Sequence, residues 1–343
     1  MSQSEDLYAK SLKYQEVHPK VRARELASML GVTEAQLVAA GCHGGNTQLR
    51  CEYEAIFNDL SALGELLAIT RNDAIVHEVH ATYKDMKKRG NVGMFFEPSL
   101  DARFFFDRWF SVFAVNEKGR HSIQFFDQQG QSAHKIYMLK DTDINRYNEL
   151  VKKYRDPDKT KEEINFPVTP LVAPGHVDEE AIKASWSAMG SVHEGGGIIH
   201  KFALGDYQSA YKALGIEYAV EVEKKAVEEF IKNSSNVNQS MRIFVMNGAS
   251  VQSYAGIMSE CFISGPWFNI LKKKFNLHLK TQALGHVWLV KKPVKNGIAV
   301  SMSILSQEGK EIMVISDSRS KVLGQSELWL GFVESLINKF QLK

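Results

Sequence analysis

The 343-residue sequence contains few cysteines and lacks any long hydrophobic run. Its three cysteines, Cys42, Cys51 and Cys261, show neither metal-ligand spacing nor a disulfide framework. No apolar stretch approaches the roughly 20 residues that a membrane-spanning helix requires. The first residues, Met-Ser-Gln-Ser-Glu-Asp, are polar and acidic, unlike the basic start of a secretory signal. These absences predict a protein of the reducing cytoplasm without a membrane span.

The sequence also lacks an excess of charge of one sign. Its 42 basic residues are balanced by 40 acidic ones, so the formal net charge is +2. The longest basic run, Lys272-Lys273-Lys274, is more typical of a solvated surface than of a track for phosphates. We therefore expect no nucleic-acid partner, and the 44% hydrophobic and 24% charged residues indicate an ordinary globular chain.

The common catalytic signatures are missing as well. The sequence has no phosphate-binding glycine loop, no dinucleotide fingerprint between a strand and a helix, and no His-Glu-x-x-His zinc pair. It has no Gly-x-Ser-x-Gly nucleophile elbow either. Histidines, which are common ligands of metals and of heme iron, remain the main candidates for chemistry.

An internal repeat is the main organisational feature that the sequence does contain. Five segments of the first half have counterparts in the second half, in the same order and about 175 residues later: 30–41 with 204–215, 72–76 with 247–251, 93–96 with 265–268, 112–115 with 287–290, and 127–131 with 306–310. Agreement at five places in one order predicts a tandem duplication.

A proline-rich stretch separates the two repeats. Four of the eight prolines, Pro157, Pro167, Pro170 and Pro174, fall within it. Proline favours an extended, solvated connection. We therefore predict an N-terminal repeat at 1–155, a linker at 156–177, and a C-terminal repeat at 178–343 that carries the main candidate ligand.

The sequence of each repeat predicts helices in its first part and mainly strands in its later part. Short helices are predicted at 21–29 and 34–40, with Thr33 as the cap of the second, and a longer helix is predicted at 326–341. Strands are predicted at 69–76, 110–115, 122–126 and 135–138, where β-branched and aromatic residues alternate with turn signals. The expected class is α+β, with a large antiparallel sheet and packed helices in each half.

His193 is the first candidate for ligand binding. It precedes three consecutive glycines, Gly195 to Gly197, and His200 follows them. Glycine costs about 1 kcal/mol in a helix interior, so the run predicts a helix end or a distorted turn. Glycines also remove side chains, which would let a flat ligand approach the backbone closely. The alternative is a flexible surface loop with an incidental histidine.

Arg103 is the second candidate, because it lies among many aromatic residues. It could be a cation held in an apolar pocket, or it could simply pair with Asp101 or Asp107. The neighbouring phenylalanines and Trp109 are expected in the core. His278 aligns with Arg103 when the two repeats are compared. It could belong to a second site, be the remnant of one, or have a structural role.

These residues together resemble a family, the bacterial hemin-transport and hemin-degrading proteins of the HemS, ChuS and PhuS type. The resemblance spans about residues 15 to 332 and rests on the two repeats and three motifs: Gly265-Pro-Trp-Phe-Asn269, Phe275-Asn-Leu-His-Leu279 and Leu100-Asp-Ala-Arg103. It implies two similar domains with large antiparallel sheets and a heme bound in a cleft.

The resemblance also implies roles for particular residues. His193, in a Val-His motif, matches the axial ligand of the heme iron, and Arg103 matches a catalytic arginine on the opposite side of the heme. Lys291 and Lys292, before Pro293, match a basic pair near the heme edge.

Two segments depart from the family pattern. Arg319 falls in a late basic motif and is a further candidate for a propionate, but Val322-Leu323 replaces the proline that usually follows this motif. The glycine run replaces bulky apolar residues after His193, which leaves His200 as an alternative ligand.

The function implied is heme binding in bacterial heme uptake and iron acquisition, with oxidative, heme oxygenase-like degradation of the heme. An external electron donor is expected, since the sequence offers no flavin or nicotinamide site, and a heme ABC importer or a downstream heme oxygenase is a possible partner. One alternative is a non-catalytic heme carrier. Another is a duplicated interaction module without a ligand.

Overall fold

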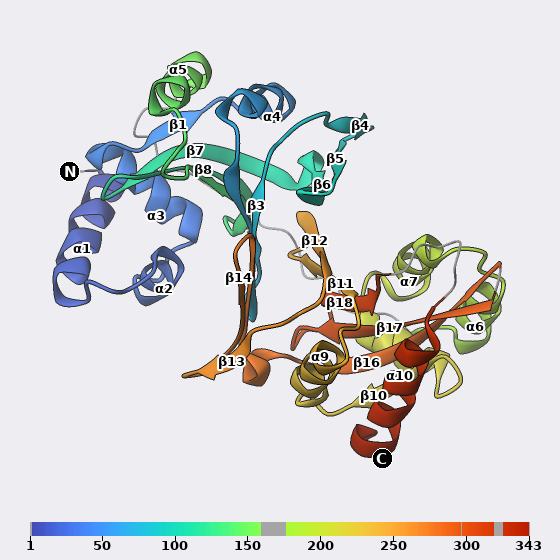
Figure 1. The fold of residues 1–343 in the computed structure, drawn as a ribbon. Coiled ribbons are helices and arrows are strands. Elements are labelled where there is room, and N and C mark those ends of the chain that lie inside the picture. The colour runs from blue at the N-terminus through green and yellow to red at the C-terminus, as the bar shows by residue number, and fades with distance from the viewer. Residues whose placement is uncertain (1, 159–175, 296, 319–324, 343) are drawn as a thin grey trace. The chain divides into compact units, whose positions relative to one another are not determined.

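The computed structural model describes residues 2–158, 176–295, 297–318 and 325–342 (Figure 1). The described residues form an α+β protein with two antiparallel sheets, as predicted. Arg319 and most of the predicted linker at 156–177 lie outside the described residues. The division at that linker into an N-terminal and a C-terminal repeat therefore stays a prediction.

The first half contains five α-helices and nine strands among its described residues. The helices are α1 (Gln3–Val17), α2 (Ala23–Met29), α3 (Glu34–Ala40), α4 (Tyr53–Leu60) and α5 (Ile144–Tyr154). The strands are β1 (Thr47–Leu49), β2 (Leu66–Arg71), β3 (Ile75–Ala81), β4 (Lys87–Arg89), β5 (Val92–Glu97), β6 (Leu100–Phe105), β7 (Trp109–Glu117), β8 (Arg120–Asp127) and β9 (Ser132–Tyr137).

The second half repeats this succession element for element. Its helices are α6 (Glu179–Ser187), α7 (Gly195–Ala203), α8 (Tyr207–Leu214), α9 (Ala226–Asn236) and α10 (Glu327–Phe340). Its strands are β10 (Ala219–Val222), β11 (Met241–Met246), β12 (Ser250–Gly256), β13 (Cys261–Ser264), β14 (Trp267–Lys272), β15 (Phe275–Leu279), β16 (Val287–Val294), β17 (Gly297–Leu305) and β18 (Glu311–Asp317). The predicted tandem duplication is confirmed.

Each sheet takes six strands from one half of the chain and three from the other. The strand order is β1-β7-β8-β9-β2-β3-β15-β14-β13 in the first sheet and β10-β16-β17-β18-β11-β12-β6-β5-β4 in the second. The two orders become identical when nine is added to each strand number of the first half and subtracted from each of the second. The sequence predicted a large sheet in each half but not this exchange of three strands.

The chain forms two compact units, and each unit includes one short segment from the other half of the chain. Unit 1 comprises Met1–Arg71, Glu78–Pro170 and Asn247–Gln252, whereas unit 2 comprises Asn72–His77, Leu171–Met246 and Ser253–Lys343. The short inserted segments begin at Asn72 and Asn247, which are equivalent positions of the repeat. The predicted continuous strand at 69–76 is therefore wrong, because a turn at Asn72 separates β2 from β3.

Asn72 anchors the first of these segments within unit 2. Its side-chain oxygen accepts hydrogen bonds from the backbone N–H groups of Ala74 (3.1 Å) and Ile75 (2.9 Å). Its side-chain nitrogen donates to the carbonyl oxygens of Met246 (3.0 Å) and Ile312 (3.1 Å). The amide thereby fixes both the turn and its neighbours in the unit.

Asn247 does the same for unit 1. Its oxygen accepts from the backbone N–H groups of Ala249 (3.1 Å) and Ser250 (2.9 Å). Its nitrogen donates to the carbonyl oxygens of Arg71 (3.1 Å) and Ser132 (2.9 Å). The two asparagines are thus equivalent in structure as well as in sequence.

The sheet strands of unit 1 are covered by helices on both faces, with α4 and α5 along one of them (Figure 1). Val112 and Ala114 of β7 pack into the cluster that contains residues of α4 and α5, whereas Phe113 and Val115 pack against α3. Successive side chains of a strand point to opposite faces, and here both faces of β7 are covered. Consecutive residues of β7 are therefore apolar along most of its length.

The core of unit 1 is built around Phe57. Its ring stacks on those of Phe104 (centroids 4.9 Å apart) and Phe125 (5.3 Å). Trp109 and Phe104 are buried, as the sequence predicted, while Phe110 is 38% exposed. The aromatic residues before Phe110 therefore act largely as core.

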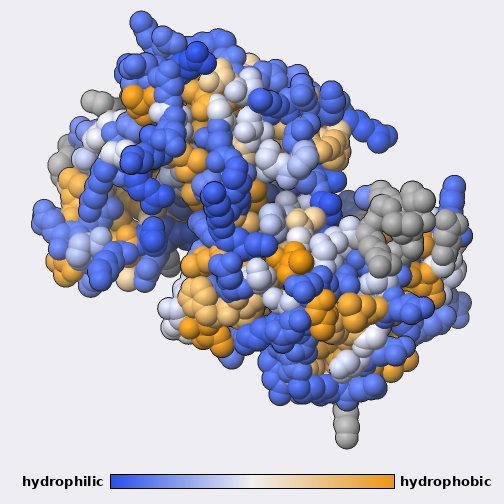
Figure 2. All heavy atoms as spheres, in the orientation of Figure 1, coloured by the Kyte–Doolittle hydropathy of each residue, from blue (hydrophilic) through white to orange (hydrophobic). Residues whose placement is uncertain are grey.

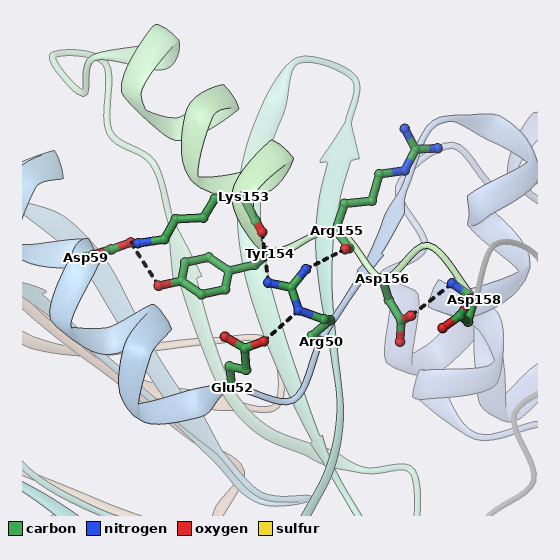
Figure 3. A network of polar contacts seen from close by, with 8 residues as sticks. All are labelled: Arg50, Glu52, Asp59, Lys153, Tyr154, Arg155, Asp156 and Asp158. Atoms are coloured by element: carbon green, nitrogen blue, oxygen red, sulfur yellow. Dashed lines mark hydrogen bonds and ion pairs between the residues drawn. The ribbon is translucent and has the colours of Figure 1, made fainter.

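The end of α5 is held by side chains from two other segments (Figure 3). The Arg50 guanidinium donates to the carbonyl oxygens of Arg155 (2.9 Å) and Lys153 (3.0 Å), which the helix end leaves without an intrahelical partner. The Tyr154 hydroxyl and Lys153 Nζ both donate to Asp59 of α4, at 2.9 and 2.7 Å. These contacts fix α5 against α4 just before the connection between the repeats.

Unit 2 contains the segments that bear most of the candidate residues. Trp288 and Val290 of β16 pack into a cluster with residues of α6, α7 and α8. On other elements, the rings of Phe230 in α9 and Trp329 in α10 meet edge to face at 5.0 Å. Among the described residues, no helix is both long enough and apolar enough to cross a lipid bilayer.

Candidate functional site

His193 lies in a short 3-10 helix, Val192–Glu194, directly before α7. Its side chain is exposed. The hydroxyl oxygen of Ser191 accepts a hydrogen bond from the backbone N–H of His193 (3.4 Å) and caps this turn. The local sequence therefore places an accessible imidazole at the entrance of a helix.

The glycine run forms the first turn of α7, which begins at Gly195. The predicted helix end is thus a helix start, and the alternative of a flexible loop does not describe this segment. Gly196 and Gly197 are exposed. A methyl group added at Gly197 would meet no atom within 4 Å, so the surface beside His193 is open at this point.

Gly195 is buried, in contrast to the other two glycines. A Cβ atom there would lie 3.2 Å from Cη2 of Trp186 and 3.7 Å from Cε of Lys292. Trp186 also donates a hydrogen bond from its indole N–H to the carbonyl oxygen of Lys291 (2.9 Å). Trp186 therefore joins β16 to the start of α7 and brings Lys292 beside the segment that carries His193.

Trp186 is the positioning residue that the sequence interpretation missed. It lies on α6, seven residues before His193, and it is fully buried. A tryptophan ahead of a glycine run is a usable signal, since a glycine leaves room for a large ring to pack directly against the backbone of a helix.

The other candidates of unit 2 are the two lysines and His200. Lys291 and Lys292 are consecutive in β16, so their side chains point to opposite faces of the strand, and both are partly buried. His200 is exposed on α7. The structure thus places His193, His200 and Lys292 on or beside one helix, and Lys291 on the strand that supports it.

Arg103 belongs to unit 1, on β6. Its Nη1 donates to Oδ1 of Asp101 (3.0 Å), and its guanidinium lies 5.3 Å from the ring centre of Phe96. Of the two carboxylates considered from the sequence, the structure pairs Asp101 with this arginine. A guanidinium has five N–H donors, so one bond to Asp101 leaves capacity for a ligand.

His278 occupies the position of Arg103 in the second repeat. Met94 pairs with Arg103 across β5 and β6, and Asn269 pairs with His278 across β14 and β15, each 175 residues later. The imidazole Nδ1 of His278 lies 2.7 Å from Oδ1 of Asn269. This contact gives His278 a structural role, which was one of the three readings left open.

His77 and His80 lie on opposite faces of β3. His77 is fully buried, and this burial lowers its pKa to about 3, whereas His80 is partly exposed beside Glu65 (3.3 Å). No group of three His, Cys, Asp or Glu side chains in the described part of the chain could hold a metal ion.

A family model describes both repeats of the chain. The model of the haemin-degrading HemS/ChuX domain matches residues 31–154 and 206–336. The chain belongs to this family. The two matched stretches correspond to the two halves of the duplication.

Individual members of the HemS/ChuX family resemble the chain over nearly its whole length. The hemin transport protein HmuS of Yersinia pestis is 28% identical over 338 residues, which are 97% of this chain and 98% of HmuS. The structure of holo-PhuS, a heme-binding protein from Pseudomonas aeruginosa, aligns with a TM-score of 0.92 and 27% identity, over 98% of this chain and 99% of PhuS. ChuS, an E. coli heme oxygenase, gives a TM-score of 0.86 and 26% identity, over 97% and 99% of the two chains.

The residues around His193 can be tested against the heme that such family members bind. A heme needs an axial ligand, an open surface for its flat ring, and cations for its carboxylates. The exposed His193 imidazole, the open glycine positions and the Lys292 side chain beside Gly195 supply these three kinds of group. The residues present in unit 2 therefore fit a heme.

Proposed function

We propose that the protein binds heme and degrades it oxidatively with electrons from an external donor. The observation that carries the proposal is the exposed His193 at the start of α7, beside uncovered glycines and next to Lys292. Membership of the HemS/ChuX family supports it, as do relatives named for hemin transport and heme oxygenase activity. The protein would act in the cytoplasm during bacterial heme uptake and iron acquisition.

Each candidate residue has a role in this proposal. His193 would hold the heme iron through its imidazole. Lys292 and Arg319 would bind propionates through charge-assisted hydrogen bonds. Lys291, on the opposite face of β16, would add positive charge near the heme edge. Arg103 would donate hydrogen bonds to water or to oxygen-bearing groups. The bound heme would supply the redox-active iron, while the chain would orient the ring.

A hemin titration followed by absorbance tests the ligand. His193→Ala should weaken hemin binding at least about tenfold and change the Soret band, since a coordinate bond is lost. His200→Ala is the matched control on the same helix and should bind like the unchanged protein. The opposite pattern would assign the iron to His200.

A time course with ascorbate tests the enzymatic part. The stoichiometric heme complex is given ascorbate in the presence of catalase, which removes free peroxide. We expect the Soret band to disappear with formation of a verdoheme- or biliverdin-like product, and we expect Arg103→Ala to slow this loss. A heme complex that survives reductant and oxygen unchanged would refute degradation.

The second candidate function is a heme carrier that delivers heme to a separate oxygenase. It is favoured by the glycines in the first turn of α7, because each weakens a helix by about 1 kcal/mol and a helix start that opens easily would ease release. In that case the Soret band persists with ascorbate, and the heme passes to an added apo-acceptor.

A further inference from the structure

The strand β4 of unit 1 and the turn before it concentrate positive charge at the end of a sheet. Four cations, here called the basic edge, fall within residues 84–89 together with one acid, Asp85: Lys84, Lys87, Lys88 and Arg89. The whole chain, in contrast, has a formal net charge of only +2. β4 is the last strand in the order of its sheet, and all four cations are exposed. Figure 2 shows the protruding segment around β4 as hydrophilic.

Most of the basic edge is not neutralised by the protein itself. Lys88 pairs with Glu54 of α4. Lys84, Lys87 and Arg89 make no side-chain hydrogen bond or ion pair with any residue that the structure describes. Three cations of the basic edge are therefore available to the anionic groups of a partner.

The second repeat shows that the fold does not require this charge. Lys87 pairs with Met94 as Phe262 pairs with Asn269, so β13 is the counterpart of β4. The equivalent segment 259–264 contains no lysine or arginine, and Glu260 is its one charged residue. Lysines on an edge strand often prevent edge-to-edge aggregation, yet β13 ends its own sheet without one. The basic edge is therefore a property of the first repeat and not of the architecture.

The basic edge lies close to Arg103 within the same unit. Lys87 stands opposite Met94 of β5, and Met94 stands opposite Arg103 of β6. Neighbouring strands are about 4.8 Å apart, so the backbone of β4 runs about 10 Å from that of β6. A protein bound at the basic edge is thus held beside the strand that carries Arg103.

The extent of the basic edge suits a protein partner better than a nucleic acid. Nucleic-acid sites distribute many cations along one face of a strongly basic domain, whereas here the charge is confined to one short segment of a nearly neutral chain. Complexes of electron-transfer proteins are small, often below about 1,200 Å², and use complementary charges to speed association. Oxidative degradation of heme consumes electrons, for which the sequence offers no flavin or nicotinamide site. These observations favour an acidic electron donor.

We propose that the basic edge is the docking site of an acidic protein that donates single electrons. The proposal rests on the proposed function, because heme degradation is the process that consumes the electrons. Lys84, Lys87 and Arg89 contact carboxylates of the donor through charge-assisted hydrogen bonds, which salt weakens by screening. Each encounter passes one electron from the donor to the ferric iron of the heme, so the donor is oxidised and the iron is reduced to the ferrous state.

A binding titration with an acidic two-iron ferredoxin tests the docking site without heme. The triple variant Lys84→Gln/Lys87→Gln/Arg89→Gln should bind the ferredoxin about tenfold more weakly at low salt, since three surface charge pairs are lost. At about 0.5 M salt the difference from the unchanged protein should disappear. Surface plasmon resonance would measure both affinities.

A matched control removes the same charge elsewhere in unit 1. Lys118, Lys140 and Lys152 are exposed and lie outside β4–β6. The variant Lys118→Gln/Lys140→Gln/Lys152→Gln should bind the ferredoxin within about twofold of the unchanged protein.

Reduction kinetics provide a second readout on the heme complex. The rate constant for reduction by the ferredoxin should fall about tenfold in the triple variant of the basic edge, as its affinity for the ferredoxin does. Reduction by ascorbate, which needs no docking site, should keep its rate, and the affinity for hemin should not change.

Three outcomes would overturn the inference. The first is equal ferredoxin affinity in the triple variant and the unchanged protein, and the second is no binding of ferredoxin by the unchanged protein. The third is binding of a short DNA duplex that depends on these cations while ferredoxin does not bind, which would assign the basic edge to nucleic acid. None of them touches the proposed function, which fails instead if the unchanged protein does not bind hemin or if its heme complex survives ascorbate.

Discussion

At the scale of the residue, one missing side chain organises the neighbourhood of His193. Gly195 lets the Trp186 ring lie against the first turn of α7, and the same ring bonds to the backbone of β16. The position of the candidate ligand relative to Lys292 therefore depends on a residue that contributes no functional group. Gly197, two residues later, contacts nothing that an added methyl group would disturb.

These two glycines should respond in opposite ways to alanine. Gly197→Ala should raise the free energy of unfolding by about 0.5–1 kcal/mol, because alanine loses less backbone entropy in a helix. Gly195→Ala should lower it by about 1 kcal/mol, since overpacking against Trp186 exceeds that gain. Urea unfolding measures both, and an equal stabilisation by both variants would show that the contact with Trp186 does not constrain the site.

The residue scale is also where prediction from the sequence was most mixed. Thr33 and Asp178 cap helices as capping preferences predict, because a cap is a local interaction. The glycine run alone predicts a helix end or a distorted turn, whereas the structure places it in the first turn of α7, against a Trp186 ring that becomes a neighbour only in the folded unit. Asp101 was one of two possible partners of Arg103, and only the strand geometry of β6 selects it.

At the scale of the element, the turns at Asn72 and Asn247 hold the exchanged segments. Each asparagine uses its whole side-chain amide, with two N–H groups of its own turn as donors and carbonyl oxygens of other strands as acceptors. Sequence comparison identified both segments as repeats. It could not show that the next three strands, β4–β6 and β13–β15, enter the other sheet, because strand pairing depends on partners remote in sequence.

Removing either amide should destabilise the protein strongly. Asn72→Ala and Asn247→Ala should each lower the free energy of unfolding by about 2–4 kcal/mol, because the buried backbone groups lose their partners. The two variants act as controls for each other, since their bonds are equivalent. Denaturant titration monitored by far-UV circular dichroism would measure the losses, and a loss below about 0.5 kcal/mol in both would contradict this role.

At the scale of the whole molecule, two buried histidines set the response to acid. His134 lies in the aromatic core, where its ring nitrogens are 2.7 Å from the Tyr83 hydroxyl and 3.0 Å from the Thr70 hydroxyl. Burial lowers the pKa of His134 to about 3 and that of His77 to about 3. Both therefore stay neutral in the folded protein while the unfolded chain takes up protons below pH 6.5.

The stability should therefore fall as the pH decreases from about 6.5 toward 3. The unfolded state binds more protons in this window, so the free energy of unfolding rises with pH. Each histidine should cost about 2 kcal/mol at pH 5 relative to pH 7.5. Urea unfolding at the two pH values checks this, and His134→Phe should remove about half of the difference. An unchanged pH dependence in that variant would refute the assignment.

The sequence predicted the large-scale organisation better than the connections. Duplication, fold class and the helical tail follow from order, periodicity and caps, which are local or repeated signals. The sheet in which β4–β6 and β13–β15 pair does not follow from these signals. These strands have the same local pattern whichever sheet they join.

The exchange of strands also imposes an order in time on the nascent chain. A ribosome releases residues from the N-terminus onward, yet the first sheet ends with β15, β14 and β13, which are synthesised well after β9. The first half therefore waits with an open sheet edge at β3 until residue 279 has emerged. During synthesis this edge is exposed to other chains, so slower translation of the second half should increase misassembly rather than assist folding.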